Sequence, residues 1–287
     1  MINKKALCVG INSYTAYPLK GCVNDAVAMS EYLTGLGFTV NMCIDKFATY
    51  NAILTSLKKL VSDVRSGDTV VFYYSGHGSQ VPDIDGDESD GFDECLCPVN
   101  IDFHKGNYIT DDELYSLFST IPISVNIEVI LDCCHSGSGL RSINKHAITK
   151  NYPCDDSVTR SVVQSSRAPV KKYQKNGLNS VFWSACGEGQ TSVDVKIEDS
   201  YRGAFTYSLL CTLSKGVIDR STLIEHVCQD LAKSGWKQVP TLECSVDKCS
   251  QYVFNETCTT RDVGIVKEES NLLITLKNVF KRMVTYD

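Results

Sequence analysis

Two short polar motifs hold the residues of this 287-residue chain that are best suited to chemistry. The first contains His77 between two glycines (SGHGS, 75–79), and the second contains adjacent cysteines followed by a histidine (DCCHSGS, 132–138). An imidazole can take a proton from a thiol, and the thiolate can then attack a carbonyl carbon. Glycines beside such groups let the backbone approach a substrate closely. Each motif follows an apolar run, so both are predicted to lie at strand ends.

Each motif alone has a simpler interpretation. A histidine in a glycine-rich turn is more often a structural hydrogen-bonding group, and most of the 14 cysteines are expected to be packing residues. Cys133, Cys134 and His135 could suggest zinc, but the spacing of a four-ligand zinc site is missing. The two motifs together, a histidine and a cysteine after separate strands, favour catalysis by a cysteine nucleophile.

Alternating strand and helix patterns must position these motifs. Runs rich in β-branched and aromatic residues predict buried strands at 5–11, 38–44, 69–74, 127–131 and 180–184. Helical spacing of apolar residues predicts helices at 24–36, 50–64, 110–118, 203–216 and 221–233. This alternation predicts an α/β fold with a mostly parallel central sheet and helices on both faces. Functional residues of such a sheet gather at the carboxyl ends of its strands.

The composition excludes several classes of protein. Apolar residues make up 43% of the chain, which excludes a disordered polypeptide. The net charge of −6 argues against a nucleic-acid partner. The mean hydropathy is −0.10, and no run is long enough for a membrane span or a signal peptide. We therefore expect a cytoplasmic protein with reduced cysteines and no membrane partner.

Taken whole, YYSGHGS and DCCHSGS resemble the histidine and cysteine motifs of metacaspases, the caspase-like cysteine peptidases of clan CD. The resemblance extends in order over residues 4–255, through GINSYTAYPLKGCVNDA, DGFDECLCPVN, ACGEGQTS and GAFTYSLL. It implies a caspase-haemoglobinase fold in a peptidase domain at 1–257. It also implies that Cys134 is the nucleophile and His77 the general base, with the amides of Gly78 and Cys134 forming the oxyanion hole.

Substrate preference follows from charge and from the resemblance. Asp132 lies two residues before Cys134, on the same face of its strand, and Asp25 begins a predicted helix near the first strand. Carboxylates beside a nucleophile attract Lys or Arg and repel Asp. The resemblance implies the same preference, because Cys22, Asp25, Ser75 and Asp132 match positions that line the metacaspase S1 pocket. The alternative for Asp25 is a helix cap.

The acidic run 83–94 contains no basic residue and lacks the spacing of an EF-hand loop. The resemblance implies a calcium site beside it, because Asp93, Asp111 and Asp112 match three of the usual carboxylates. The fourth position holds Arg141, a cation that weakens such a site. We expect no cofactor in the chemistry itself, and calcium only as a possible activator.

Residues 141–176 carry eight Lys or Arg with little periodicity and are predicted to form an exposed basic loop. An enzyme that prefers these residues can cut such a loop, so self-cleavage within 141–176 is predicted, with a merely solvated loop as the alternative. The C-terminal extension 258–287 shows helical spacing and is expected to dock onto the domain.

These patterns together predict a cysteine endopeptidase that acts on proteins or peptides with Arg or Lys at P1. A monomer is expected from the resemblance. One rival is a catalytically silent scaffold with the caspase fold. A second rival is an Asp-specific caspase, which would need an arginine-lined pocket instead of carboxylates.

Overall fold

A six-stranded sheet forms the centre of the protein. The computed structural model describes residues 2–84, 86, 88, 91–135, 147–154, 180–187, 189–216 and 218–255. The strand order is β12–β9–β7–β3–β1–β2, and all neighbours are parallel except the edge strand β12, which is antiparallel to β9. The strands are β1 (Lys4–Gly10), β2 (Thr39–Ile44), β3 (Thr69–Ser75), β7 (Asn126–Asp132), β9 (Ser180–Ser184) and β12 (Thr241–Glu243).

The order of strands marks the carboxyl ends of β1 and β3 as the place where a ligand is expected. The chain passes from β1 to β2 on one side and then returns to β3 on the other side of β1. Ligands of open α/β sheets bind where the strand order reverses in this way. The register pairs Gly10 with Ser75 and Ser75 with Asp132, so the three strands end at the same level.

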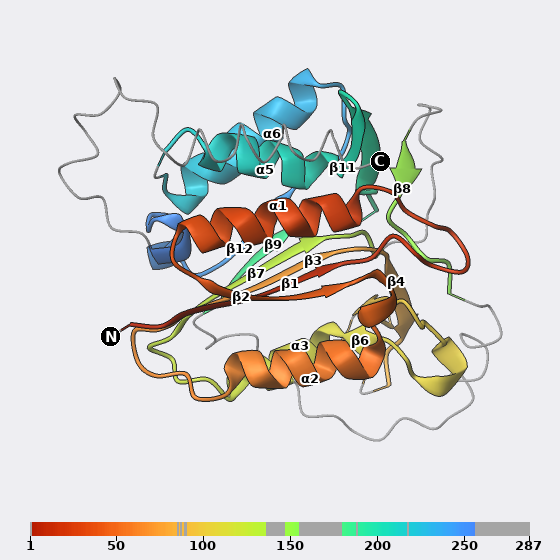
Figure 1. The fold of residues 1–287 in the computed structure, drawn as a ribbon, viewed down its shortest axis with the longest axis horizontal. Helices are drawn as coiled ribbons and strands as arrows, with labels where there is room; N and C mark the ends of the chain where they lie inside the picture. The colour runs from red at the N-terminus through yellow and green to blue at the C-terminus, as the bar shows by residue number, and fades with distance from the viewer. Residues whose placement is uncertain are drawn as a thin grey trace.

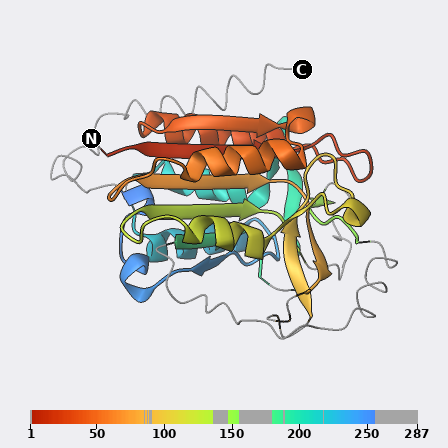
Figure 2. The same cartoon turned by 90° about the horizontal axis from the view of Figure 1, so that it is seen from below.

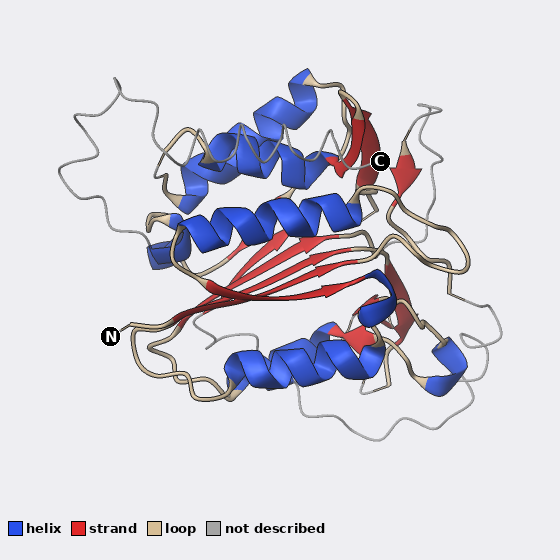
Figure 3. Cartoon of the chain, viewed as in Figure 1, coloured by secondary structure: helices blue, strands red, loops and turns tan. Residues whose placement is uncertain are grey.

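Helices cover both faces of the sheet (Figures 1 and 3). One face carries α1 (Cys22–Gly35), α5 (Ala204–Leu213) and α6 (Arg220–Lys233), and the other carries α2 (Tyr50–Val61) and α3 (Asp111–Ser119). A short helix, α7 (Val246–Cys249), follows β12. Thr110 and Glu113 form the capping box that starts α3.

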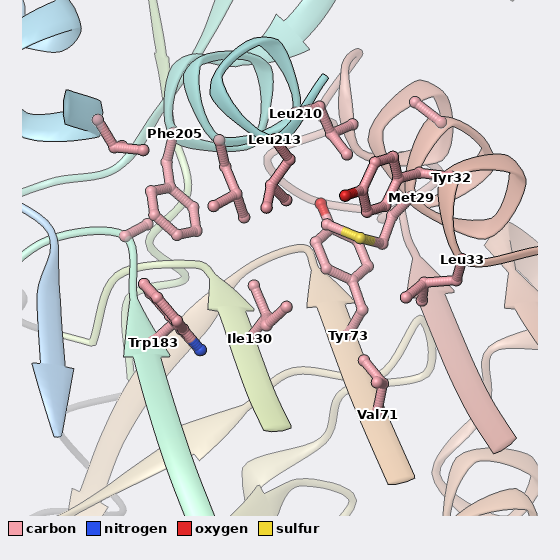
Figure 4. Packing of buried hydrophobic residues seen from close by; sticks show 14 of the residues in the cluster. Met29, Tyr32, Leu33, Val71, Tyr73, Ile130, Trp183, Phe205, Leu210 and Leu213 are labelled. Carbon is pink, nitrogen blue, oxygen red and sulfur yellow. The ribbon is translucent and has the colours of Figure 1, made fainter. Parts of the chain in front are cut away.

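Each face of the sheet has its own hydrophobic core. Figure 4 shows the first, in which Tyr73, Ile130 and Trp183 of the sheet pack against side chains such as Met29 of α1 and Phe205 of α5. The second core lies under α2 and α3. Strand β3 is buried along its whole length, which explains why its sequence is a continuous apolar run instead of an alternating one.

Two small antiparallel sheets lie at the carboxyl ends of the central strands (Figure 2). One consists of β4 (Gly78–Pro82), β5 (Phe92–Leu96) and β6 (Ile109–Thr110), and the other of β8 (Ile148–Thr149), β10 (Val193–Ile197) and β11 (Ser200–Gly203). Three short 3-10 helices are η1 (Asp45–Phe47), η2 (Phe103–Lys105) and η3 (Val253–Asn255).

The predicted α/β class and all five predicted strands and five predicted helices are confirmed, with ends that differ by a few residues. The two small sheets were not predicted, because their strands are short and follow no clear alternation. No described helix is long and apolar enough to cross a membrane. The extension 258–287 lies outside the described residues.

Candidate active site

His77 lies two residues beyond the end of β3 and is fully buried. Its Nε2–H donates to the carbonyl oxygen of Tyr17 at 2.6 Å, and its backbone N–H donates to the hydroxyl of Tyr14 at 3.0 Å. Because a carbonyl only accepts, Nε2 carries the proton of the neutral ring, and Nδ1 keeps its lone pair. Nδ1 has no hydrogen-bond partner among the described residues. Burial lowers the pKa of His77 to about 4.

Cys134 lies two residues beyond the end of β7, the strand beside β3. The register pairs Ser75 with Asp132, so His77 and Cys134 follow their strands by the same number of residues. The thiol is buried and lies 3.9 Å from the carbonyl oxygen of Ser192. Burial raises its pKa to about 12, an effect that a backbone hydrogen bond at Ser192 and the nearby Lys150 ammonium oppose. The pair is therefore a neutral imidazole and a neutral thiol in this state.

Gly78 brings the two motifs into direct contact. A Cβ atom at this position would lie 2.6 Å from the carbonyl oxygen of Cys134 and 2.8 Å from Nδ1 of His135, so only glycine fits without a shift. The backbone N–H groups of Gly78 and Cys134 both point to the carbonyl oxygen of Lys150, at 3.0 and 3.3 Å. The two amides that were predicted to form an oxyanion hole therefore converge on one oxygen atom.

The predicted substrate-binding residues converge beside these amides. We call the group formed by Cys22, Asp25, Ser75, Asp132 and Asp194 the carboxylate pocket. All five residues are buried, and they come from α1, β3, β7 and β10. The pocket thus joins the ends of two central strands and the first turn of α1 to one of the small sheets.

The ammonium group of Lys150 fills the carboxylate pocket. Its Nζ lies 3.1 Å from Asp132, 3.3 Å from Asp25 and 3.4 Å from Asp194, and it donates to Oγ of Ser75 at 2.9 Å. The Lys150 side chain has no exposed surface. A buried ammonium group needs this number of anionic and polar partners to offset its desolvation.

The charges in the carboxylate pocket are unequal, since three carboxylates surround one ammonium. Burial alone would lower the pKa of Lys150, but Asp132, Asp194 and Asp25 raise it well above its ordinary value. Burial raises the pKa of Asp25 to about 7, and the excess of carboxylates adds to this while Lys150 opposes it. The pocket therefore favours a bound cation and a proton on Asp25 near neutral pH.

Asp25 is not the cap of its helix. The helix begins after Gly21, and the carboxylate of Asp25 accepts the backbone N–H of Gly203 at 2.9 Å. Asp132 is held by Oγ of Ser192 at 2.7 Å and by Oγ1 of Thr206 at 2.5 Å. These contacts fix both carboxylates towards the Lys150 ammonium group, and the helix-cap alternative is wrong.

The prediction that 141–176 forms an exposed loop is wrong at Ile148–Thr149, which form β8, and at Lys150, which is buried. There β8 pairs with β10, and the Lys150 N–H donates to the Ser192 carbonyl oxygen at 3.0 Å. The reason is charge, because three buried carboxylates attract the Lys150 ammonium group and offset the cost of removing it from water. The rest of the loop lies outside the described residues.

Sequence reasoning missed three residues of this site: Lys150, Asp194 and Gly203. Asp194 stands two residues after the ACGEGQTS segment, and a single carboxylate in a short strand gives no signal of its own. Gly203 opens the GAFTYSLL segment, and a Cβ atom there would lie 2.5 Å from Nζ of Lys150. Lys150 was one of eight basic residues with nothing local to distinguish it.

The possible metal ligands separate into two places. Within the described part of the chain, ligand atoms of Cys22, Asp25 and Asp194 lie within 4.8 Å of one another, but the Lys150 ammonium already contacts both carboxylates. Asp93 lies on β5, and Asp111 and Asp112 begin α3; these three do not form such a cluster among the described residues. Arg141 lies outside the described residues. Calcium activation stays a prediction.

Comparison with known proteins agrees with this geometry. Residues 3–251 match a family model described as a caspase domain. Metacaspase-1A of Aspergillus oryzae is 30% identical over 285 residues, which cover 84% of this chain and 68% of that protein. Metacaspase-2 of Trypanosoma brucei brucei is 33% identical over 266 residues, which cover 84% of this chain and 73% of that protein. The crystal structure of protein GSU0716 from Geobacter sulfurreducens, 24% identical, has the same fold with a TM-score of 0.67 and covers 88% of this chain and 98% of that one.

Proposed function

This chain belongs to the caspase-domain family of cysteine peptidases, and we propose that it is an endopeptidase that cleaves peptide bonds after Lys or Arg. The observation that carries the proposal is the position of Lys150. Its side chain fills the carboxylate pocket while its carbonyl oxygen accepts two backbone N–H groups beside Cys134. A substrate would present its P1 residue in the same way.

The P1 preference is supported by the charge and depth of the carboxylate pocket. The three carboxylates Asp25, Asp132 and Asp194 favour a cation and would repel an acidic P1 side chain. A buried lysine spans the distance from the strand ends to these carboxylates, and arginine carries the same charge on a stem of similar length. An Asp-specific caspase would need the opposite charge here.

The chemical steps follow from the groups at the strand ends. Nδ1 of His77 accepts the thiol proton of Cys134, and the sulfur attacks the P1 carbonyl carbon. The N–H groups of Gly78 and Cys134 stabilise the oxyanion of the tetrahedral intermediate. His77 then returns the proton to the departing amine, and water hydrolyses the thioester to release a carboxylate. The bond from Nε2 to the Tyr17 carbonyl keeps the ring in the tautomer that these steps need.

We assign the proposed self-cleavage to the bond between Lys150 and Asn151. The Lys150 carbonyl already lies on the two amides that would stabilise its oxyanion. Attack by the Cys134 sulfur would form a thioester with Lys150 and release the amine of Asn151, and water would complete the hydrolysis. Until then, the chain's own lysine occupies the pocket that a substrate needs, so the uncut chain is self-inhibited.

Peptide hydrolysis tests the proposed activity. Fluorogenic peptides that differ only in a P1 residue of Arg, Lys or Asp are incubated with wild-type protein, Cys134→Ala and the matched control Cys211→Ala, whose cysteine lies on α5. Turnover of the Arg and Lys peptides is expected in wild type and control and none in Cys134→Ala. If Cys134→Ala hydrolyses the peptides as fast as wild type, Cys134 is not the nucleophile. If no variant hydrolyses them, with or without calcium, the alternative of a catalytically silent scaffold is favoured.

We also propose calcium as an activator, bound near Asp93, Asp111 and Asp112, although the chemistry itself needs no metal. Carboxylate oxygens are the ligands that calcium prefers. A calcium titration of the thermal unfolding temperature tests binding apart from activity, with Asp93→Asn as the variant and Asp63→Asn, which is exposed on a loop, as the control. A rise in unfolding temperature that Asp93→Asn alone abolishes is expected; no rise in wild type contradicts the proposal.

A further inference from the structure

The ring of Tyr152 lies among aromatic side chains, of which the cleavage steps require only His77. It meets the Tyr17 ring edge to face at a centroid distance of 5.3 Å and the His77 ring in the same manner at 5.6 Å. The rings of Phe103 and Tyr14 lie at 6.1 and 6.2 Å. These are the distances and tilted arrangements that aromatic pairs favour.

The backbone fixes how Tyr152 relates to the proposed scissile bond. The N–H of Gly78 donates to the carbonyl of Lys150, and the N–H of Tyr152 donates to the carbonyl of Gly78 at 2.9 Å. Residues 150–152 thus run as a short parallel strand along Gly78, with Asn151 as its bridge partner. Because Lys150 is at P1, Tyr152 is at P2′, two residues beyond the bond.

The rings around Tyr152 are held from separate elements. The Tyr14 hydroxyl donates to the Cys97 carbonyl at 2.8 Å, and Tyr14 is buried, so it forms a fixed inner wall. Tyr17 is 56% exposed and forms an outer rim. Phe103 is half-buried on η2, which Asp102 caps through the backbone N–H groups of His104 and Lys105. Tyr14 and Phe103 are therefore held by contacts outside the segment that carries Tyr152.

We propose that Tyr14, Tyr17, His77 and Phe103 form an S2′ subsite that selects an aromatic residue two positions after the cleaved bond. The inference rests on the proposed peptidase function. In the uncut chain Tyr152 occupies the subsite, and after cleavage a substrate's P2′ side chain takes its place. Specificity is then set on both sides of the bond, by charge at P1 and by aromatic packing at P2′.

A peptide series tests the subsite in the full chain. Internally quenched peptides carry the sequence Ala-Ile-Thr-Lys-Asn-X-Pro, in which X is Tyr, Phe, Ala or Glu. We expect kcat/KM for Tyr and Phe to exceed that for Ala roughly ten-fold, as for one large apolar side chain in a pocket. Equal rates for Tyr and Ala would overturn the proposal.

Substitution of a pocket wall provides a second readout. Phe103→Ala should reduce the Tyr-to-Ala ratio several-fold, whereas the matched change Phe47→Ala, at a residue 65% exposed on η1, should leave the ratio unchanged. An unchanged ratio in Phe103→Ala would remove Phe103 from the subsite. Because the readout is a ratio of two substrates, a general loss of folded enzyme does not mimic the effect.

Self-cleavage tests the same contact within the chain. Tyr152→Ala should slow formation of the fragment that begins at Asn151 about ten-fold, and Tyr152→Phe, which keeps the ring, should restore it. Equal rates in wild type and Tyr152→Ala would contradict the subsite.

A fluorogenic Arg amide, which has no P2′ residue, separates the two proposals. If it is not hydrolysed, the proposed function fails. If it is hydrolysed but all peptides of the P2′ series have the same kcat/KM, only the proposal of the subsite is wrong.

Discussion

The ammonium group of Lys150 lies 3.1 Å from the carboxylate of Asp132, and neither side chain has any exposed surface. Asp132 ends β7, directly before the two cysteines, whereas Lys150 comes from the basic segment that follows. Their contact anchors a substrate-like segment across the strand ends. The proposed P1 preference, the proposed self-cleavage and the burial of Cys134 therefore all depend on this one contact.

The proposed scissile bond predicts one fragment boundary. Wild-type protein should yield a C-terminal fragment that begins at Asn151, detected by intact mass and N-terminal sequencing. Lys150→Arg should still be cut there, since arginine keeps the charge, but Lys150→Gln should not be cut at this bond. Cys134→Ala should stay intact. A first cut at a different residue in the wild type would show that the assignment to Lys150 is wrong.

Gly203→Ala should block the carboxylate pocket. The added methyl group would lie 2.5 Å from the position of Nζ and 2.8 Å from the Asp25 carboxylate. We expect kcat/KM for an Arg peptide to fall roughly 100-fold or more, the size of effect that a misplaced reacting group causes. Gly187→Ala is the matched control, because its Cβ would meet its nearest neighbours at 3.8 Å. Similar losses in both variants would argue against blockage of the pocket.

Asp194→Asn should weaken binding of a cationic P1 side chain. The asparagine can still accept the backbone N–H groups of Lys20 and Gly21 that Asp194 accepts at 2.9 and 2.7 Å, so the local fold should persist. Loss of one charge-assisted contact in a buried site corresponds to about 10- to 100-fold in kcat/KM, mostly through KM. Asp63→Asn serves as the control. A change in kcat with constant KM would assign Asp194 a different role.

Self-cleavage should remain fast in mildly acidic solution. Burial lowers the pKa of His77 from 6.5 to about 4, and the neutral, proton-accepting ring is the form present above that value. The first-order rate at about pH 5.5 should therefore stay within about two-fold of the rate at about pH 7.5. An unshifted histidine would give a fall of roughly ten-fold, which would contradict the buried position of the ring. Asp25, whose pKa is raised to about 7, gains a proton in this range, but Asp132 and Asp194 also contact the ammonium.

Much of the fold was open to prediction because its signals are local. Apolar runs such as β3 are buried on both faces and read as strands, and the Thr110 to Glu113 capping box marks a helix start. The ends of β3 and β7 therefore located His77 and Cys134. The small sheets gave no such signal, because strands as short as Ile148–Thr149 are defined by their partners.

The sequence by itself determined the α/β sheet and the two motifs at its strand ends, since strand periodicity and strand ends are properties of neighbouring residues. Its resemblance to metacaspases supplied four members of the carboxylate pocket. Only the tertiary structure decided that Asp194 completes the pocket, that Gly203 leaves room for it and that Lys150 fills it. Those contacts join residues far apart in the chain. Lys150 is one of eight basic residues in its segment, and its ammonium group is buried against three carboxylates from other parts of the chain. Lys150 is buried because the carboxylates attract its ammonium group, and the residues next to it in the sequence give no sign of this attraction.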